Sequence, residues 1–215
     1  MSSVIVAPSI LSADFSALGD DITKIVNDGA DWIHCDVMDG AFVPNISFGP
    51  FIVDAVNRIT DTLLDVHLMI EEPIRYLESF AKAGADIITV HADACSDLSA
   101  TIDKIIDLGC RVGVAVNPDK EISLFTEFLD RVDLALVMSV YAGFGGQKFI
   151  PETMDKVAEL AKIREERGLE YKIEVDGGVN GETAKVCIDA GADVLVAGSY
   201  LFGGDNYREG IESLR

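Results

Sequence analysis

Short apolar runs rich in β-branched residues alternate with amphipathic stretches along the whole chain. The runs lack strict polar–apolar alternation, which is typical of strands covered on both faces. Eight of them predict strands: Val4–Ala7, Trp32–Asp36, Leu63–Leu68, Ile87–His91, Arg111–Val116, Leu134–Met138, Lys172–Asp176 and Val194–Ala197. The stretches that follow them predict helices: Ala17–Asp28, Pro50–Ile59, Pro73–Ala83, Leu98–Leu108, Leu124–Asp130, Thr153–Arg167, Glu182–Ala190 and a short one near Asn206–Leu214. The pattern is therefore eight strand–helix units.

A recurring tripeptide, Gly-Ala-Asp, supports this count. It stands at Gly29–Asp31, Gly84–Asp86 and Gly191–Asp193, each time between a predicted helix and a predicted strand. The glycines are 55 and 107 residues apart, close to two and four units of about 27 residues. Each glycine suits the left-handed residue that ends a helix.

Eight units of this length predict an α/β fold, a parallel eight-stranded (β/α)8 TIM barrel with outer helices, as a single domain over residues 1–215. A doubly wound open sheet is the competing architecture. No linker, low-complexity tract or repeat of another kind suggests a second domain.

Composition narrows the class of protein. The 215 residues are 49% hydrophobic and 25% charged, as in a soluble globular protein. The net charge of −20 argues against nucleic-acid and anionic-membrane partners. Residues Met1–Pro8 lack a basic start and no apolar run reaches 18 residues, so neither a signal peptide nor a membrane span is expected. The four cysteines form no C-x-x-C pair, which favours reduced thiols in a cytoplasmic protein.

Candidate chemistry lies at the carboxyl ends of the predicted strands, where barrels gather their functional groups. His34, Asp36, His67 and Asp176 supply two imidazoles and two carboxylates from three strands. Such mixed nitrogen and oxygen donors suit one divalent ion such as Zn, Fe, Mn or Co. The alternative is that each is a hydrogen-bonded polar group of the barrel core. His91, the third histidine, either forms a hydrogen bond that orients a metal ligand or makes hydrogen bonds within the core.

Three methionines lie near these groups. Met38 and Met69 each stand two residues beyond a candidate ligand, and Met138 ends the sixth strand. Their apolar thioethers could form a lining that excludes water from a reactive intermediate, or they could simply pack in the core.

Glycine-rich turns follow the last three strands. They are Gly143-Phe144-Gly145-Gly146, Gly177-Gly178 and Gly198-Ser199. Glycine lets backbone N–H groups approach an anion, and barrels often bind phosphate near their last strands. Only Lys148 is near in sequence, so backbone amides would bind most of the phosphate.

At these residues the sequence resembles the ribulose-phosphate 3-epimerase family. The matching segments are residues 7–15 (APSILSADF), 34–45 (HCDVMDGAFVPN), 65–70 (DVHLMI), 143–151 (GFGGQKFIP) and 174–180 (EVDGGVN). The resemblance implies a barrel that binds one divalent metal through His34, Asp36, His67 and Asp176. It implies that Asp36 and Asp176 are the paired acid and base, that Ser9 and His67 touch the sugar, and that the glycine turns hold its phosphate. The reaction would interconvert D-ribulose 5-phosphate and D-xylulose 5-phosphate in the pentose phosphate pathway.

The chemistry agrees with this resemblance, because inverting a carbon next to a ketone needs one group to accept a proton and another to return one. No nucleotide or redox cofactor is needed, and a homo-oligomer is expected. The family usually has Asn-Pro where this chain has Tyr141-Ala142, which leaves a ketohexose phosphate such as D-allulose 6-phosphate as an alternative substrate. A decarboxylase or aldolase of the related orotidine-phosphate decarboxylase group is another alternative. That group carries Lys where this chain has Met38, which argues against it. A non-catalytic phosphosugar-binding barrel would have no use for both Asp36 and Asp176.

Overall fold

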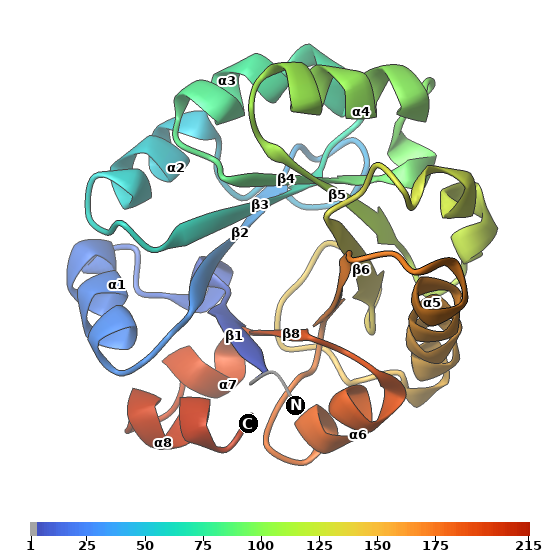
Figure 1. Cartoon of the computed structure of the whole chain (residues 1–215). Coiled ribbons are helices and arrows are strands. Elements are labelled where there is room, and N and C mark those ends of the chain that lie inside the picture. Colours follow the sequence, from blue (N-terminus) through green and yellow to red (C-terminus); the bar gives the residue numbers. More distant parts are fainter. Residues whose placement is uncertain (1–3) are drawn as a thin grey trace.

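Eight parallel strands form a nearly closed barrel, and the helices form a ring around it (Figure 1). The structure is a computed structural model that describes residues 4–215, so the first three residues of the Met1–Pro8 stretch lie outside it. The strands are β1 (Ile5–Pro8), β2 (Trp32–Met38), β3 (Leu63–Met69), β4 (Ile87–His91), β5 (Arg111–Val116), β6 (Leu134–Met138), β7 (Lys172–Asp176) and β8 (Val194–Ala197). The predicted TIM barrel and its eight strands are therefore confirmed.

The outer ring contains eight α-helices among the described residues. They are α1 (Leu18–Asn27), α2 (Pro50–Asn57), α3 (Leu77–Lys82), α4 (Leu98–Asp107), α5 (Met154–Arg167), α6 (Thr183–Ala190), α7 (Ser199–Phe202) and α8 (Tyr207–Glu212). Short 3-10 turns complete it: η1 (Ile10–Ser12), η2 (Pro73–Arg75), η3 (Ala92–Ala94), η4 (Ile122–Leu124), η5 (Thr126–Phe128) and η6 (Pro151–Thr153). The four-residue helix α7 was not predicted from the sequence.

One helix prediction is wrong. The segment predicted as a helix over Leu124–Asp130 contains only the last residue of the 3-10 turn η4 and the 3-10 turn η5. The break falls at Phe125, whose φ of −138° is outside the helical range. Phe125 is fully buried, so its packing in the core sets the backbone there. Similarly, Tyr76 separates η2 from α3 within the predicted helix Pro73–Ala83.

The barrel closes between β1 and β2 through one isolated bridge. Neighbouring strands pair in the order β1-β8-β7-β6-β5-β4-β3-β2. The remaining gap is joined where Ser9, directly after β1, pairs with His34 on β2. The closure thus brings a predicted sugar-binding residue beside a predicted metal ligand.

An aspartate before each even-numbered strand fastens that strand to the preceding odd-numbered one. The carboxylate Oδ2 atoms of Asp31, Asp86, Asp133 and Asp193 each accept a backbone N–H from the second residue of β1, β3, β5 and β7, at 2.8 Å in every case. The N–H group of each aspartate donates to the carbonyl of that same residue. Three of these aspartates end the repeated Gly-Ala-Asp, whose glycines have φ between 102° and 112°, as a left-handed helix end requires. The repeat in the sequence is therefore a repeated strand junction.

Side chains alternate between two environments along the strands. Outward residues such as Cys35, Val66 and Val175 pack against the helices in the main core. Inward residues form a separate apolar cluster of Ala7, Trp32, Ile87, Leu134, Val194 and Val196. Trp32, Ile87, Leu134 and Val194 begin their strands, whereas Val196 reaches the pocket. Toward the carboxyl ends the inward positions become polar, and the candidate site lies there.

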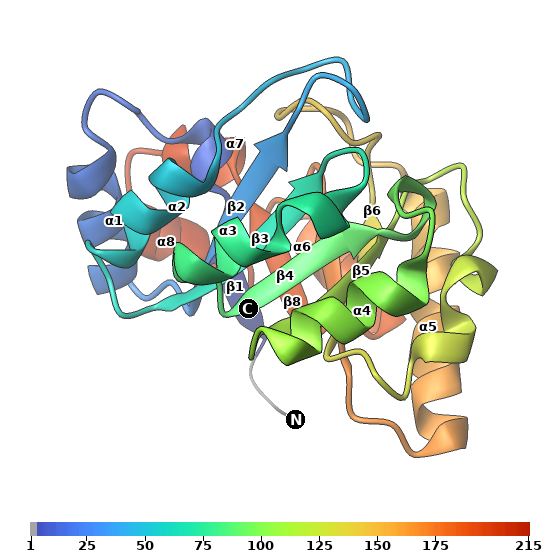
Figure 2. The same ribbon diagram turned by 90° about the horizontal axis from the view of Figure 1, so that it is seen from above.

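Loops cover this carboxyl end of the barrel. In Figure 2 the loop after β2 and the loop after β6 approach each other above the strands. The side-chain Nδ2 of Asn45, in the first loop, donates to the carbonyl of Gly143, in the second, at 2.8 Å. In residues 4–215 no helix has the length and apolar character needed to span a bilayer.

Candidate active site

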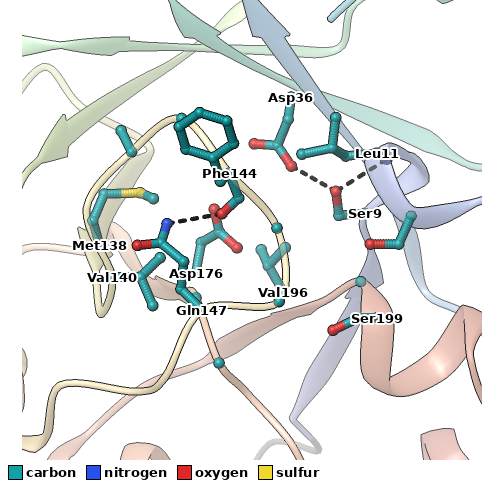
Figure 3. Close-up of a pocket in the computed structure, with 18 of the residues that line it drawn as sticks. Ser9, Leu11, Asp36, Met138, Val140, Phe144, Gln147, Asp176, Val196 and Ser199 are labelled. Atoms are coloured by element: carbon teal, nitrogen blue, oxygen red, sulfur yellow. Dashed lines mark hydrogen bonds between the residues drawn. The ribbon is translucent and has the colours of Figure 1, made fainter. Parts of the chain in front are cut away.

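A pocket opens at the carboxyl ends of the strands (Figure 3). Predicted residues that line it are Ser9, Asp36, Met38, Met69, Met138, Gly143, Phe144, Gly145, Gly146, Asp176, Gly177, Gly178, Gly198 and Ser199. The remaining predicted residues, His34 and His67, are fully buried and do not line the pocket. The structure therefore brings all the predicted side chains and turns together, with the two imidazoles behind the wall.

Asp36 is the centre of the buried polar cluster. Its Oδ1 lies 2.9 Å from Nδ1 of His67 and 3.2 Å from Nε2 of His34, and its Oδ2 accepts a 2.5 Å hydrogen bond from the Ser9 hydroxyl. Burial raises the pKa of Asp36, but the His34 charge and the hydrogen bonds from both histidines outweigh it and hold the pKa well below its usual range. Asp36 is therefore an ionised carboxylate.

Asp176, on β7, faces the same pocket with the opposite tendency. Burial raises its pKa to about 7, and the negative charge of Asp36 acts in the same direction. Two neighbouring carboxyl groups thus differ strongly in proton affinity, which is the arrangement that lets one accept a proton while the other donates.

The four candidate ligands fit a divalent metal ion. One ligand atom from each of His34, Asp36, His67 and Asp176 lies within 4.8 Å of the others. Two imidazole nitrogens and two carboxylate oxygens are a donor set for Zn²⁺ or another first-row divalent ion. The ring atoms that face Asp36 are Nε2 of His34 and Nδ1 of His67, so these nitrogens are the ones available to an ion.

His91 stands directly behind His67. The two Nε2 atoms are 2.9 Å apart, and the rings stack with centroids 5.0 Å apart. Burial, together with the His67 charge, holds the pKa of His91 well below its usual range. A neutral His91 can accept the hydrogen of His67 Nε2 and leave His67 Nδ1 free for an ion. This geometry favours support of a ligand over an unrelated core role.

The methionines form the apolar part of the wall. Met38 and Met69 pack together with Val43, and Met138 packs with Ala115 and Leu136. All three methionines are at most 3% exposed. They both fill the core and line the pocket, so the two alternatives raised from the sequence are compatible.

The glycine turns have backbone conformations that other residues rarely adopt. Gly143, Gly146, Gly177 and Gly178 have φ of 126°, 71°, 118° and 65°. A Cβ at Gly178 would lie 2.6 Å from the backbone nitrogen of Phe149, so no side chain fits. No Lys or Arg is among the residues that line the pocket, and Lys148 lies outside it. Backbone N–H groups are thus the donors available to an anion.

Sequence reasoning missed several polar residues beneath the pocket. Asp65, Thr89 and Glu174 are all fully buried and point into the barrel. Each stands two residues before His67, His91 or Asp176, so the two-residue period of a strand was the signal that could have found them. Gln147 was also missed: its Nε2 donates to the carbonyls of Tyr141 and Phe144 and braces the turn after β6 (Figure 3).

Solved structures place this fold among the TIM-barrel proteins. The chain resembles 3-keto-L-gulonate-6-phosphate decarboxylase from Vibrio cholerae O1 biovar El Tor, with a TM-score of 0.74 at 16% identity over 100% of this chain and 96% of that one. It also resembles 3-hexulose-6-phosphate synthase from Salmonella typhimurium, with a TM-score of 0.72 at 18% identity over 98% and 96%. At such low identity these similarities define the barrel fold alone.

Sequence comparison identifies the family. The profile of the ribulose-phosphate 3 epimerase family matches residues 5–202. The ribulose-phosphate 3-epimerase of Bacillus subtilis is 53% identical over 98% of this chain and 97% of that protein. The Escherichia coli K12 enzyme of that name is 42% identical over 100% and 96%, and the chloroplastic ribulose-5-phosphate-3-epimerase of Arabidopsis thaliana is 49% identical over 100% and 77%. The chain belongs to the ribulose-phosphate 3-epimerase family, which confirms the resemblance found in its motifs.

Proposed function

We propose that this protein is an isomerase that inverts C3 of D-ribulose 5-phosphate to give D-xylulose 5-phosphate, and the reverse, within the pentose phosphate pathway. The observation that carries the proposal is the pair Asp36 and Asp176, which come from β2 and β7 and face one pocket. Family membership supports the reaction class.

The proposed chemistry is an exchange of protons between these two carboxyl groups and C3. One carboxylate accepts the C3 proton as the C3–H bond breaks. The electrons of that bond form a C2–C3 double bond and displace the carbonyl electrons onto its oxygen, which gives an enediolate. The other, protonated carboxyl then donates its proton to the opposite face of C3. The opposed pKa tendencies of Asp36 and Asp176 support this division of labour.

We assign one divalent metal ion to His34, Asp36, His67 and Asp176. When bound, a divalent ion supplies positive charge that stabilises the negative oxygen of an enediolate. Ser9 lines the pocket, so it would contact the sugar and would also orient Asp36 through their hydrogen bond. His67, which the resemblance also assigned to the sugar, is buried behind the pocket wall and would act on the substrate through the metal ion. The methionines Met38, Met69 and Met138 would keep water from the reacting carbon. No nucleotide or redox cofactor takes part.

We assign the binding of the substrate's phosphate group to the glycine turns Gly143–Gly146, Gly177–Gly178 and Gly198–Ser199. Their backbone N–H groups are the donors available there, because no Lys or Arg is among the residues that line the pocket. Tyr141 lines the pocket, is 54% exposed, and belongs to the pair Tyr141-Ala142 that replaces the family's usual Asn-Pro. D-Allulose 6-phosphate is for this reason the comparison substrate in the test below.

Two further assignments complete the proposal. A cytoplasmic location fits the four free cysteines at Cys35, Cys95, Cys110 and Cys187, since disulfides are rare in that compartment. A homo-oligomer stays a prediction that sedimentation of the purified protein would test.

Solvent-deuterium exchange at C3, followed by NMR, tests the mechanism. The unmodified protein should incorporate deuterium at C3 of ribulose 5-phosphate and form xylulose 5-phosphate. Asp176→Asn and Asp36→Asn should each lose epimerisation by about 10²–10⁴-fold, and each should exchange C3 of one epimer only, because one carboxylate remains on one face. Epimerisation by Asp176→Asn at the unmodified rate would exclude the two-carboxylate mechanism. Exchange of allulose 6-phosphate in preference would reassign the substrate.

A further inference from the structure

A layer of buried polar groups lies between the apolar floor of the barrel and the candidate metal ligands. Asp65, Thr89 and Glu174 are 0% exposed and point inward from three different strands. Burying a carboxylate costs several kcal/mol unless it is hydrogen-bonded. A fold that retains these groups so close to His34 therefore suggests that at least some of them act on it.

His34 is held from behind by Asp65. Its Nδ1 lies 2.6 Å from Asp65 Oδ2, while its other ring nitrogen, Nε2, lies 3.2 Å from Asp36 Oδ1. The contact with Asp65 is the shorter one, so we place a hydrogen on Nδ1, which donates to Asp65 Oδ2. The contact of Nε2 with Asp36 is the longer of the two, so Nε2 is the nitrogen that would give up its hydrogen to an ion while Nδ1 keeps its own in the bond to Asp65.

Asp65 is in turn held by Thr89. The Thr89 hydroxyl donates to Asp65 Oδ1 at 3.2 Å, so both carboxylate oxygens have a partner. Thr89 has room because its neighbour on β5 is Gly113: a Cβ at Gly113 would lie 2.0 Å from the Thr89 hydroxyl oxygen. Gly113 thus lets Thr89 occupy the barrel interior, and contacts run from β5 through β4 and β3 to His34 on β2.

Glu174 makes no comparable contact. Its nearer oxygen is 3.8 Å from His34 Nδ1, and within residues 4–215 neither of its carboxylate oxygens has a hydrogen-bond partner. The orientation of His34 therefore depends on Asp65, which is 2.6 Å from Nδ1, and not on Glu174, which is beyond hydrogen-bond distance.

We propose that Thr89 and Asp65, with the space provided by Gly113, are positioning residues that fix the tautomer and ring orientation of His34 and so preorganise the metal site. The inference rests on the metal site of the proposed function. Neither residue touches the pocket, so their effect on the reaction is exerted through His34.

Metal affinity, measured with Zn²⁺ or Co²⁺ in competition with a chromophoric chelator, tests the chain of contacts. Asp65→Ala should weaken binding about 10–100-fold, the range found when a ligand loses its supporting partner. Thr89→Val should weaken it less, and Thr89→Ser, which keeps the hydroxyl, should restore it. The double variant Asp65→Ala/Thr89→Val should have the metal affinity of Asp65→Ala alone, because Thr89 acts only through Asp65.

The matched control is Thr101→Val. Thr101 is also a buried threonine that makes one hydroxyl hydrogen bond, but it lies on α4 and bonds to the carbonyl of Asp97. Thr101→Val removes the same hydroxyl as Thr89→Val but leaves the barrel interior unchanged. This variant should therefore bind metal like the unmodified protein. Thr89→Val keeps the test valid if Asp65→Ala does not fold.

A second readout is the ¹⁵N NMR spectrum of His34 in the Zn²⁺-loaded protein, which should show hydrogen on Nδ1 and metal on Nε2. The inference is overturned if hydrogen is on Nε2, or if Thr89→Val and Asp65→Ala bind within twofold of Thr101→Val. If the unmodified protein binds no divalent ion, the metal site of the proposed function fails and the inference fails with it. Binding by the unmodified protein that is unchanged in the variants would refute the positioning chain alone.

Discussion

Gly178 offers a direct test of the phosphate assignment, because the structure leaves no space for a side chain there. Its φ is 65°, and a Cβ would lie 2.6 Å from the backbone nitrogen of Phe149 and 3.0 Å from the carbonyl oxygen of Gln147. Replacing Gly178 by alanine therefore combines two effects. The left-handed backbone costs about 1–2 kcal/mol for a residue with a Cβ, and the contact forces neighbouring backbone to move.

The size of that movement follows from the geometry. Ordinary contact begins at 3.4 Å, so the Phe149 nitrogen must retreat by roughly 0.8 Å, or Gly178 must move by as much. A shift of this size would misalign the N–H groups that we assign to the phosphate. A hydrogen bond to a charged group contributes about 1.5–3 kcal/mol, so losing one should lower kcat/KM about 10–100-fold, mainly through KM.

Two other glycines separate strain from steric contact. Gly109 has φ of 79° and no atom within 4 Å of its Cβ position, and it is far from the pocket lining. Gly146 has φ of 71° and equally free space, but it lines the pocket. Urea denaturation should show similar losses of stability for Gly109→Ala and Gly146→Ala and a larger loss for Gly178→Ala. Steady-state kinetics should show unchanged kcat/KM for Gly109→Ala. If Gly178→Ala matched Gly109→Ala in kcat/KM, the phosphate assignment for this turn would be refuted.

Two further predictions concern the ionisation of the site and the repeated strand junction. A metal ion binds the deprotonated carboxylate, and burial raises the pKa of Asp176 to about 7, so apparent metal affinity should fall as the pH drops below 7, approaching about tenfold per pH unit. Calorimetric titration between pH 5 and 8 measures this, and an affinity independent of pH would contradict it. Asp86→Ala leaves the buried N–H of Leu64 without its carboxylate acceptor, which should cost about 1–3 kcal/mol and lower Tm by roughly 2–12 °C. Asp86→Asn keeps an acceptor oxygen and should lose less; equal losses in calorimetric melting of the two variants would show that the contact is not the cause.

The sequence by itself was enough for the barrel and for the four candidate ligands, because both depend on local rules. Strand runs and helix periods are visible within a few residues of each other, and the spacing of Gly-Ala-Asp repeats the unit length. The parallel topology then places every strand end at the same rim. His34, Asp36, His67 and Asp176 could therefore be grouped without knowing any distance between them.

Tertiary structure alone decided which partners hold those ligands in place. The contact of Asp65 with His34, and of Thr89 with Asp65, depends on the register between neighbouring strands and on the space left by Gly113. Register is set by long-range pairing, which no local pattern states. The same holds for the segment around Phe125, where burial of one side chain overrides helix propensity. The sequence thus determined which groups meet at the rim, whereas packing between strands determined how each is oriented.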